Sequence, residues 1–171
     1  MSRNEVLVRY NPTTQIQLCK NEQDCFFGSH PTLAQLNATY GQNTASVWLM
    51  PQLSNLVEFI GGENKMSGAV QQELAEIIAQ EYQYLRTTEL MLFFAEYKKA
   101  SFGKQFGSLR TNDILQGLHT FVMERRADAK YKRIKDEEKA ERERSYQEYL
   151  KNPATPEQIQ KVLNKIKLKK V

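Results

Sequence analysis

The stretch Glu89–Lys99, with the sequence ELMLFFAEYKK, decides the fold of this chain. Its apolar residues cover nearly every side of a helix, which is typical of a helix at the centre of a core. The segments on either side of it have apolar residues at helical spacing on one face only. These segments are residues 33–40, 47–60, 70–85 and 114–122. We therefore predict an all-α domain of four or five helices over residues 30–126.

Residues 1–29 have the weakest pattern in the chain. Val6, Val8 and Tyr10 alternate with other residues, and a second alternating run at 15–19 follows Asn11-Pro12. Two short alternating runs joined by an Asn-Pro turn favour a hairpin. Because a lone hairpin is only marginally stable in water, we expect residues 1–29 to be a flexible arm or a short hairpin.

The charge of the chain is unevenly distributed. The 171 residues include 24 Lys+Arg and 20 Asp+Glu, for a net charge of +4. Residues 127–151 mix both signs, contain no glycine or proline, and include acid-before-base pairs such as Glu138–Arg142, which support a helix. This pattern predicts a charged, solvent-exposed helix that projects into solvent or bridges to a partner. Residues 135–145 carry no apolar seam of the kind that a typical coiled coil needs.

A further segment, residues 152–171, follows the helix breaker Asn152-Pro153. Thr155 is expected to cap a new helix, with Gln158 reaching back to it. An apolar stripe among many lysines makes this a basic amphipathic helix, and we predict that its lysines bind nucleic acid through salt-sensitive phosphate contacts. The predicted nucleic-acid-binding residues are Lys161, Lys165, Lys167, Lys169 and Lys170.

Signatures of the common enzyme classes are absent from the sequence. It contains no P-loop, dinucleotide-binding glycine motif, nucleophile elbow or zinc-protease helix, each of which has a fixed spacing. Glu89 and Glu96 are interpreted as a solvated helix edge. His30 is interpreted as a loop residue, and His119 as a partly buried helix residue. We predict no catalytic residue, no enzymatic activity and no cofactor.

Metal binding is also disfavoured by the count of possible ligands. Cys19, Cys25, His30 and His119 are all the cysteines and histidines present, whereas structural zinc takes four ligands at short spacings. We predict no metal site and two reduced thiols, as is usual in the cytoplasm. No apolar run reaches the roughly 18 residues of a membrane span, and the N-terminus lacks a signal-peptide pattern. We expect a cytoplasmic protein that makes no membrane contact.

Two Phe-Gly pairs make residues 102–107 the most unusual loop of the sequence. Phe102, Lys104 and Phe106, with Arg110 close by, combine rings and cations that suit single-stranded nucleic acid. In the alternative, which we favour, the rings complete the core and the glycines make turns. The four residues are candidate loop contacts in the first interpretation.

Residues 85–94, 102–108 and 114–126 together resemble a family of small uncharacterised proteins carried by phages and mobile elements of gut bacteria. The family pattern is an E-L helix, then Y-G-x-F/I-Y-G-x-x-D, then a helix ending in E-R. Glu89-Leu90 and Glu124-Arg125 match it, whereas Phe102 and Phe106 replace both tyrosines. The resemblance covers about residues 30–126 and implies no particular reaction. A small helical domain followed by a charged C-terminal arm is also similar in architecture to phage helicase loaders.

These observations predict a non-enzymatic accessory protein of DNA replication or of a mobile element, similar to a helicase loader. We expect it to bind a protein partner, with a replicative helicase as the candidate, and to bind DNA weakly. The alternative is a structural or assembly protein of a phage or mobile element, whose long helix forms a homo-oligomer. A membrane-surface helix is disfavoured because the tail lacks a Trp or Phe anchor.

Overall fold

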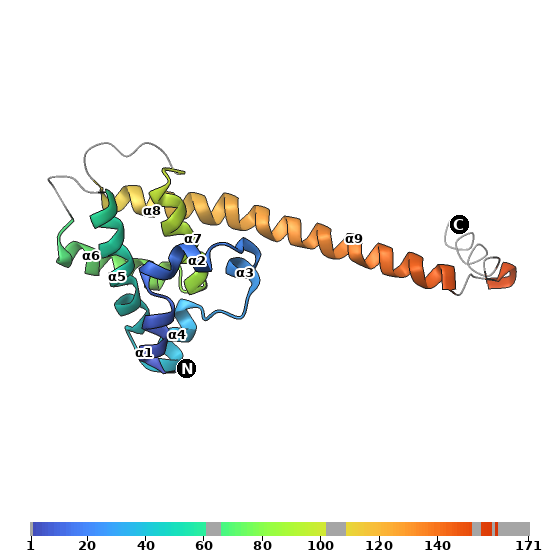
Figure 1. Cartoon of the computed structure of the whole chain (residues 1–171), viewed down its shortest axis with the longest axis horizontal. Coiled ribbons are helices and arrows are strands. Elements are labelled where there is room, and N and C mark those ends of the chain that lie inside the picture. The colour runs from blue at the N-terminus through green and yellow to red at the C-terminus, as the bar shows by residue number, and fades with distance from the viewer. Residues whose placement is uncertain (1, 61–65, 102–108, 152–154, 159, 161–171) are drawn as a thin grey trace, which may run out of the picture. The chain divides into compact units, whose positions relative to one another are not determined.

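The computed structural model (Figure 1) describes residues 2–60, 66–101, 109–151, 155–158 and 160. In these residues every regular element is a helix, apart from one isolated antiparallel bridge between Thr32 and Arg86. The predicted all-α class is confirmed. The elements are α1 (Arg3–Arg9), the 3-10 turn η1 (Pro12–Thr14), α2 (Gln15–Leu18), α3 (Glu22–Phe27), α4 (Leu33–Tyr40), α5 (Thr44–Ile60), α6 (Gly68–Glu81), α7 (Thr87–Lys98), α8 (Thr111–Thr120), the π-helical η2 (Phe121–Arg126) and α9 (Ala127–Lys151).

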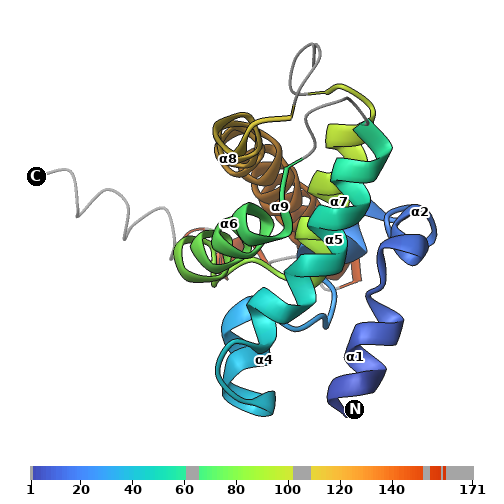
Figure 2. The same cartoon turned by 90° about the vertical axis from the view of Figure 1, so that its left-hand side faces the viewer.

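The chain divides into two compact units, residues 1–129 and residues 130–171. In the first unit α5 packs against α4, α6 and α7 (Figure 2). Helices α2 and α3 also pack against α7. The helical domain that the sequence places at residues 30–126 therefore also includes the N-terminal segment. Within the described residues, no helix is both long enough and apolar enough to cross a bilayer.

Helix α7 is the buried centre of the first unit, as its sequence predicts. Leu90, Met91, Phe93 and Phe94 have no exposed surface. The ring of Phe93 lies 5.2 Å from that of Phe94 and 5.7 Å from that of Phe121 on η2, distances at which aromatic pairs add to the gain from burial. The core of the domain is thus built around a helix that is apolar on almost every side.

Helix α5 starts before Pro51 and continues through it. It begins at Thr44 and buries Trp48, Leu49 and Leu53. Pro51 is exposed inside the helix, where its ring turns toward solvent and leaves the packed face intact. The preceding helix α4 is followed by its C-terminal cap Gly41, whose φ of 100° is a conformation that glycine adopts without strain.

The N-terminal segment is helical, so the predicted flexible arm or hairpin over residues 1–29 is wrong. Helix α1 starts with a capping box between Ser2 and Glu5. Val6 and Tyr10, four residues apart, are buried in the core, whereas Val8 is 72% exposed. Burial at i and i+4 is the helical period, and the apparent alternation came from Val8, which faces solvent.

Buried hydrogen bonds hold this segment on the domain. The Trp48 indole N–H and the Gln52 side-chain amide both donate to the carbonyl oxygen of Tyr10, at 3.0 and 2.7 Å. The amide of Gln15 donates to Oε1 of Gln52 at 2.7 Å. These bonds are made by groups that have almost no exposed surface, and they join the segment to the middle of α5. The first residues of the chain are therefore part of the core.

Helix α9 occupies Ala127–Lys151, the range predicted for the charged helix, and none of its residues is buried. Exposed ion pairs follow one another along it: Arg133–Glu137 at 2.7 Å, Arg142–Glu138 at 3.5 Å and Arg144–Glu141 at 2.6 Å. Pairs three and four residues apart stabilise an isolated helix modestly. They account for a helix here without the help of a packed apolar face.

The basic helix predicted for residues 152–171 falls mostly outside the described residues. The predicted cap at its start is confirmed. The amide N–H of Gln158 donates to Oγ1 of Thr155 at 3.4 Å, and the amide N–H of Thr155 donates to Oε1 of Gln158 at 3.0 Å. This reciprocal pair is the capping box that the sequence indicates.

Candidate functional site

Two carboxylates on α7 are buried among the domain's apolar residues. Glu89 is 1% exposed and Glu96 is 9% exposed. The interpretation of these residues as a solvated edge is therefore wrong. The reason is the position of α7: neighbouring elements cover nearly all of its surface, so that its polar residues are covered with the rest. Buried carboxylates require charged or hydrogen-bonding partners.

Glu89 receives partners at both of its oxygens. Nε of Arg126 donates to Oε1 at 2.7 Å, and the backbone N–H of Arg86 donates to Oε2 at 2.8 Å. The Arg86 guanidinium adds a longer contact, 3.8 Å from Nη1 to Oε2. Glu89 thus caps the first turn of α7 and neutralises an arginine from η2 at the same time.

Glu96 is held by the preceding arginine of η2. Nη2 of Arg125 donates to Oε1 of Glu96 at 2.7 Å and also contacts Glu22 of α3 at 3.2 Å. The hydrogen bonds with Glu96 raise the pKa of Arg125 above its usual value. Arg125 therefore joins η2 to both α7 and α3.

The element that supplies both arginines is a π-helix, a rare form found often at functional sites. Its first residue, Phe121, is buried against Phe26 and Phe93. Arg125 and Arg126 then end the element and immediately precede α9. Three ion pairs and one aromatic anchor thus fix the residues from which α9 starts.

A second polar group surrounds His30. Nε2 of His30 lies 2.8 Å from Oδ2 of Asp24, and Nδ1 lies 3.1 Å from the hydroxyl of Tyr10. A carboxylate only accepts, so Nε2 of His30 is the donor to Asp24, while Nδ1 faces the Tyr10 hydroxyl. Burial raises the pKa of Tyr10. His30 is a buried connection between α1 and α3, and its interpretation as a loop residue is incomplete.

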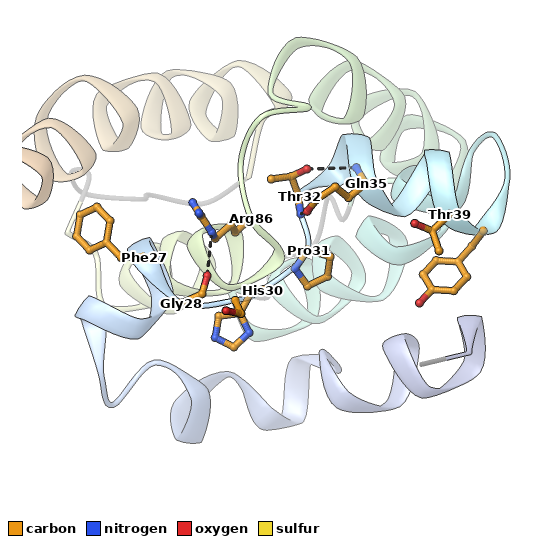
Figure 3. Close-up of a pocket in the computed structure, with 10 residues that line it drawn as sticks. Phe27, Gly28, His30, Pro31, Thr32, Gln35, Thr39 and Arg86 are labelled. Atoms are coloured by element: carbon orange, nitrogen blue, oxygen red, sulfur yellow. Dashed lines mark hydrogen bonds between the residues drawn. The ribbon is translucent and has the colours of Figure 1, made fainter.

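An open pocket of about 570 Å³ lies beside His30 (Figure 3). Residues 27–32, three residues of α4 and Arg86 line it. Nε of Arg86 donates to the carbonyl oxygen of Gly28 at 3.1 Å, which ties the loop before α4 to the start of α7. Both ring nitrogens of His30 and Nε of Arg86 are engaged by the protein itself, so these groups are held in fixed positions at the pocket.

The remaining histidine and the two cysteines are also described by the structure. His119 is exposed on α8, contrary to the partial burial expected of it. Cys19 and Cys25 are free thiols. The hydrogen bond between them raises the pKa of Cys19 and lowers the pKa of Cys25. Among the residues that the structure describes, no group of three or more His, Cys, Asp or Glu side chains could hold a metal ion.

Most of the predicted binding residues fall outside the described part of the chain. Arg110 is described: it is exposed and occupies the N-terminal cap position of α8. Those outside the described residues are Phe102, Lys104, Phe106, Lys161, Lys165, Lys167, Lys169 and Lys170.

The polar cluster of Glu89, Glu96, Arg125 and Arg126 was not predicted as a site. A usable signal was present in the sequence, because two acidic residues lie in the stretch predicted to be most deeply buried. Buried acids imply cations from elsewhere in the fold. The sequence offered several basic residues for that role and no way to choose among them.

Comparison with curated proteins and with solved structures finds no match. The model of a family of unknown function, DUF6633, matches residues 65–167. The matched range contains α6 to α9 and all four members of the polar cluster, whereas His30 lies before it. Since the match covers more than half of the chain, the protein belongs to the DUF6633 family.

Proposed function

We propose that this protein is a non-enzymatic accessory factor of DNA replication or of a mobile element, comparable to a helicase loader. Its charged helix binds a protein partner, with a replicative helicase as the candidate, and its C-terminal lysines bind DNA weakly. Such a role belongs to the cytoplasm. The observation that supports the proposal is helix α9, in which every residue from Lys130 to Lys151 is exposed.

A helix without a buried face gains no stability from packing against the core of its own chain. Its polar surface is that of a solvated strut or of a segment that bridges to another molecule. The ordered ion pairs along α9 keep it helical and display its charges at fixed spacing. A partner with a complementary charge pattern would thus meet a preorganised surface, which reduces the entropy cost of binding.

The nucleic-acid part of the proposal is tested with a tail variant of the full chain. Replacing Lys165, Lys167, Lys169 and Lys170 with alanine removes up to four phosphate contacts and should abolish retention of labelled DNA on a filter. Wild-type binding should fall steeply as salt is raised. The matched control removes four lysines from α9: Lys130, Lys132, Lys135 and Lys139. Equal DNA binding by wild type and tail variant would refute the role of the tail.

The protein-partner part is tested by binding the full chain to an immobilised replicative helicase. The four-lysine α9 variant should lose binding, while the tail variant should retain it. Retained binding by the α9 variant would show that this helix is not the contact surface.

A second candidate function is that of an assembly protein that oligomerises through α9. The observation in its favour is that Tyr131, Tyr146 and Tyr149 of this helix are each more than half exposed. Aromatic side chains are enriched where proteins contact one another. Light scattering on the full chain would give its mass in solution, and a monomer at all concentrations would exclude this candidate.

A further inference from the structure

The tyrosines of α9 lie on a common side of the helix. Tyr131 and Tyr149 are about five turns apart at 3.6 residues per turn, so their side chains leave the helix in the same direction. Ile134 and Tyr146 flank this line, about 60° to either side. All four side chains are 51–60% exposed. The helix therefore carries an apolar group at each end of one face.

Two opposite charges occupy the middle of the same face. Glu138 lies about two turns from Tyr131, and Arg142 lies about two turns from Tyr149. Both are within about 20° of the line that joins these two tyrosines. Their side chains are 58% and 82% exposed, and they contact each other at 3.5 Å. The order along the face is thus tyrosine, acid, base, tyrosine.

When the same order of groups is read in the opposite direction, each group lies opposite one that it attracts. When a second α9 runs antiparallel along the face, Tyr131 meets Tyr149 of the second copy and Glu138 meets Arg142 of the second copy. The two-fold symmetry of such a pair repeats both contacts. A parallel pair would instead place acid against acid and base against base, which is repulsive.

We propose that the face of α9 between Tyr131 and Tyr149 binds a second copy of this chain, with the two helices antiparallel and centred between Glu138 and Arg142. The middle of the interface is then a four-membered network of two acids and two bases. The apolar ends exclude water from the tyrosine contacts. Charge at the centre sets direction and register, as polar residues do in helix pairs.

This inference deepens the second candidate function and does not depend on DNA or helicase binding. The first measurement is the mass of the full chain by analytical ultracentrifugation, as a function of concentration. We expect a dimer with micromolar affinity, because one helix face is a small interface. A monomer at about 100 μM, well above that range, would overturn both the candidate function and the proposed pairing.

A charge-reversal series then tests the register. Arg142→Glu places four acids at the centre and should weaken the dimer at least tenfold. The double variant Glu138→Arg/Arg142→Glu exchanges the two charges, restores opposite signs across the pair, and should dimerise like the wild type. Failure of the double variant to recover, with the helix intact by circular dichroism, would overturn the proposed register while leaving oligomerisation itself established.

Arg144→Glu is the matched control, because Arg144 is also exposed and ion-paired but lies about 140° around the helix from the proposed face. Its dimer should be as tight as that of the wild type. Equal weakening by Arg144→Glu and Arg142→Glu would contradict the proposal, since it would indicate a general charge effect.

Orientation is tested by cross-linking in full chains that carry one added cysteine. An equimolar mixture of Tyr131→Cys and Tyr149→Cys chains should give a disulfide-linked heterodimer under mild oxidation, because these positions meet in the antiparallel pair. Each variant alone should give much less disulfide-linked dimer. Wild type is the control for any linkage through Cys19 and Cys25, which all the chains contain. Efficient linkage of each variant alone, with none in the mixture beyond that level, would show a parallel pair and overturn the proposal.

Discussion

Helices α7 and α9 both carry glutamates paired with arginines, in opposite surroundings. Glu89 of α7 is almost completely buried and bonds Arg126 at 2.7 Å, whereas Glu137 of α9 is 61% exposed and bonds Arg133 at the same distance. The geometry of the two ion pairs is alike, yet water competes for only one of them. Identical contacts therefore carry very different consequences when one partner is removed.

The largest effect is expected from breaking the buried pair. Arg126→Met leaves the carboxylate of Glu89 with only its bonds to Arg86, and should lower the free energy of unfolding by about 3–5 kcal/mol. Urea denaturation followed by circular dichroism measures this change. The double variant Glu89→Met/Arg126→Met removes both charges and should recover most of the loss. A loss below 1 kcal/mol for the single variant would mean that water reaches Glu89.

A smaller effect is expected at the other carboxylate of α7. Glu96→Gln keeps the shape of the side chain but weakens the charged hydrogen bonds from Arg125, which retains its contact with Glu22. The expected loss is about 1.5–3 kcal/mol, the range for hydrogen bonds to charged groups. The same urea measurement applies, with Glu22→Gln as the more exposed counterpart. A larger loss from Glu22→Gln than from Glu96→Gln would show that the contact of Arg125 with Glu22 contributes more stability than its contact with Glu96.

The contrast between α7 and α9 also shows which features can be predicted from sequence. The all-round apolar pattern of residues 90–94 identified the central helix, since it depends on local periodicity. The cap at Thr155 followed from a four-residue motif. These features share one property: the residues that determine them are close together in the chain.

The missed features depend on residues that are far apart in the chain. Arg126 and Glu89 meet because α7 and η2 pack together, and His30 is buried because Tyr10 and Asp24 converge on it. The N-terminal segment was misassigned because Val8, an apolar residue facing solvent, mimics strand alternation. Each of these features depends on tertiary contacts, and a local sequence pattern does not show which distant residues will meet.

The buried Lys98 of α7 and the exposed lysines of α9 should also differ in how they change the free energy of unfolding with pH. Nζ of Lys98 on α7 donates to Gln15 at 2.9 Å and also bonds Asn55, and burial lowers its pKa below the usual 10.5. The unfolded chain therefore binds more protons than the folded one as pH rises from the lowered pKa toward 10.5. Across that window the contribution of Lys98 makes the free energy of unfolding rise with pH.

The test compares wild type with Lys98→Met over this alkaline range. Tyr10 and Tyr82, whose pKa values burial raises, are present in both proteins and cancel in the difference. The stability of wild type should increase relative to the variant as pH rises. Lys139→Met, on α9, should give a profile parallel to that of wild type. Parallel profiles for all three proteins would rule out the burial of the Lys98 charge.

The smallest effect is expected from the exposed ion pair. Glu137→Gln removes the carboxylate that Arg133 bonds at 2.7 Å, on the side of α9 away from Tyr131 and Tyr149. Because water and salt already screen this pair, the free energy of unfolding should change by less than about 0.5 kcal/mol. The change should also shrink as salt is added, which the buried pair of α7 should not show. An effect above 1 kcal/mol would mean that this side of α9 is covered in solution, and a mass measurement on the same variant would show whether another copy covers it.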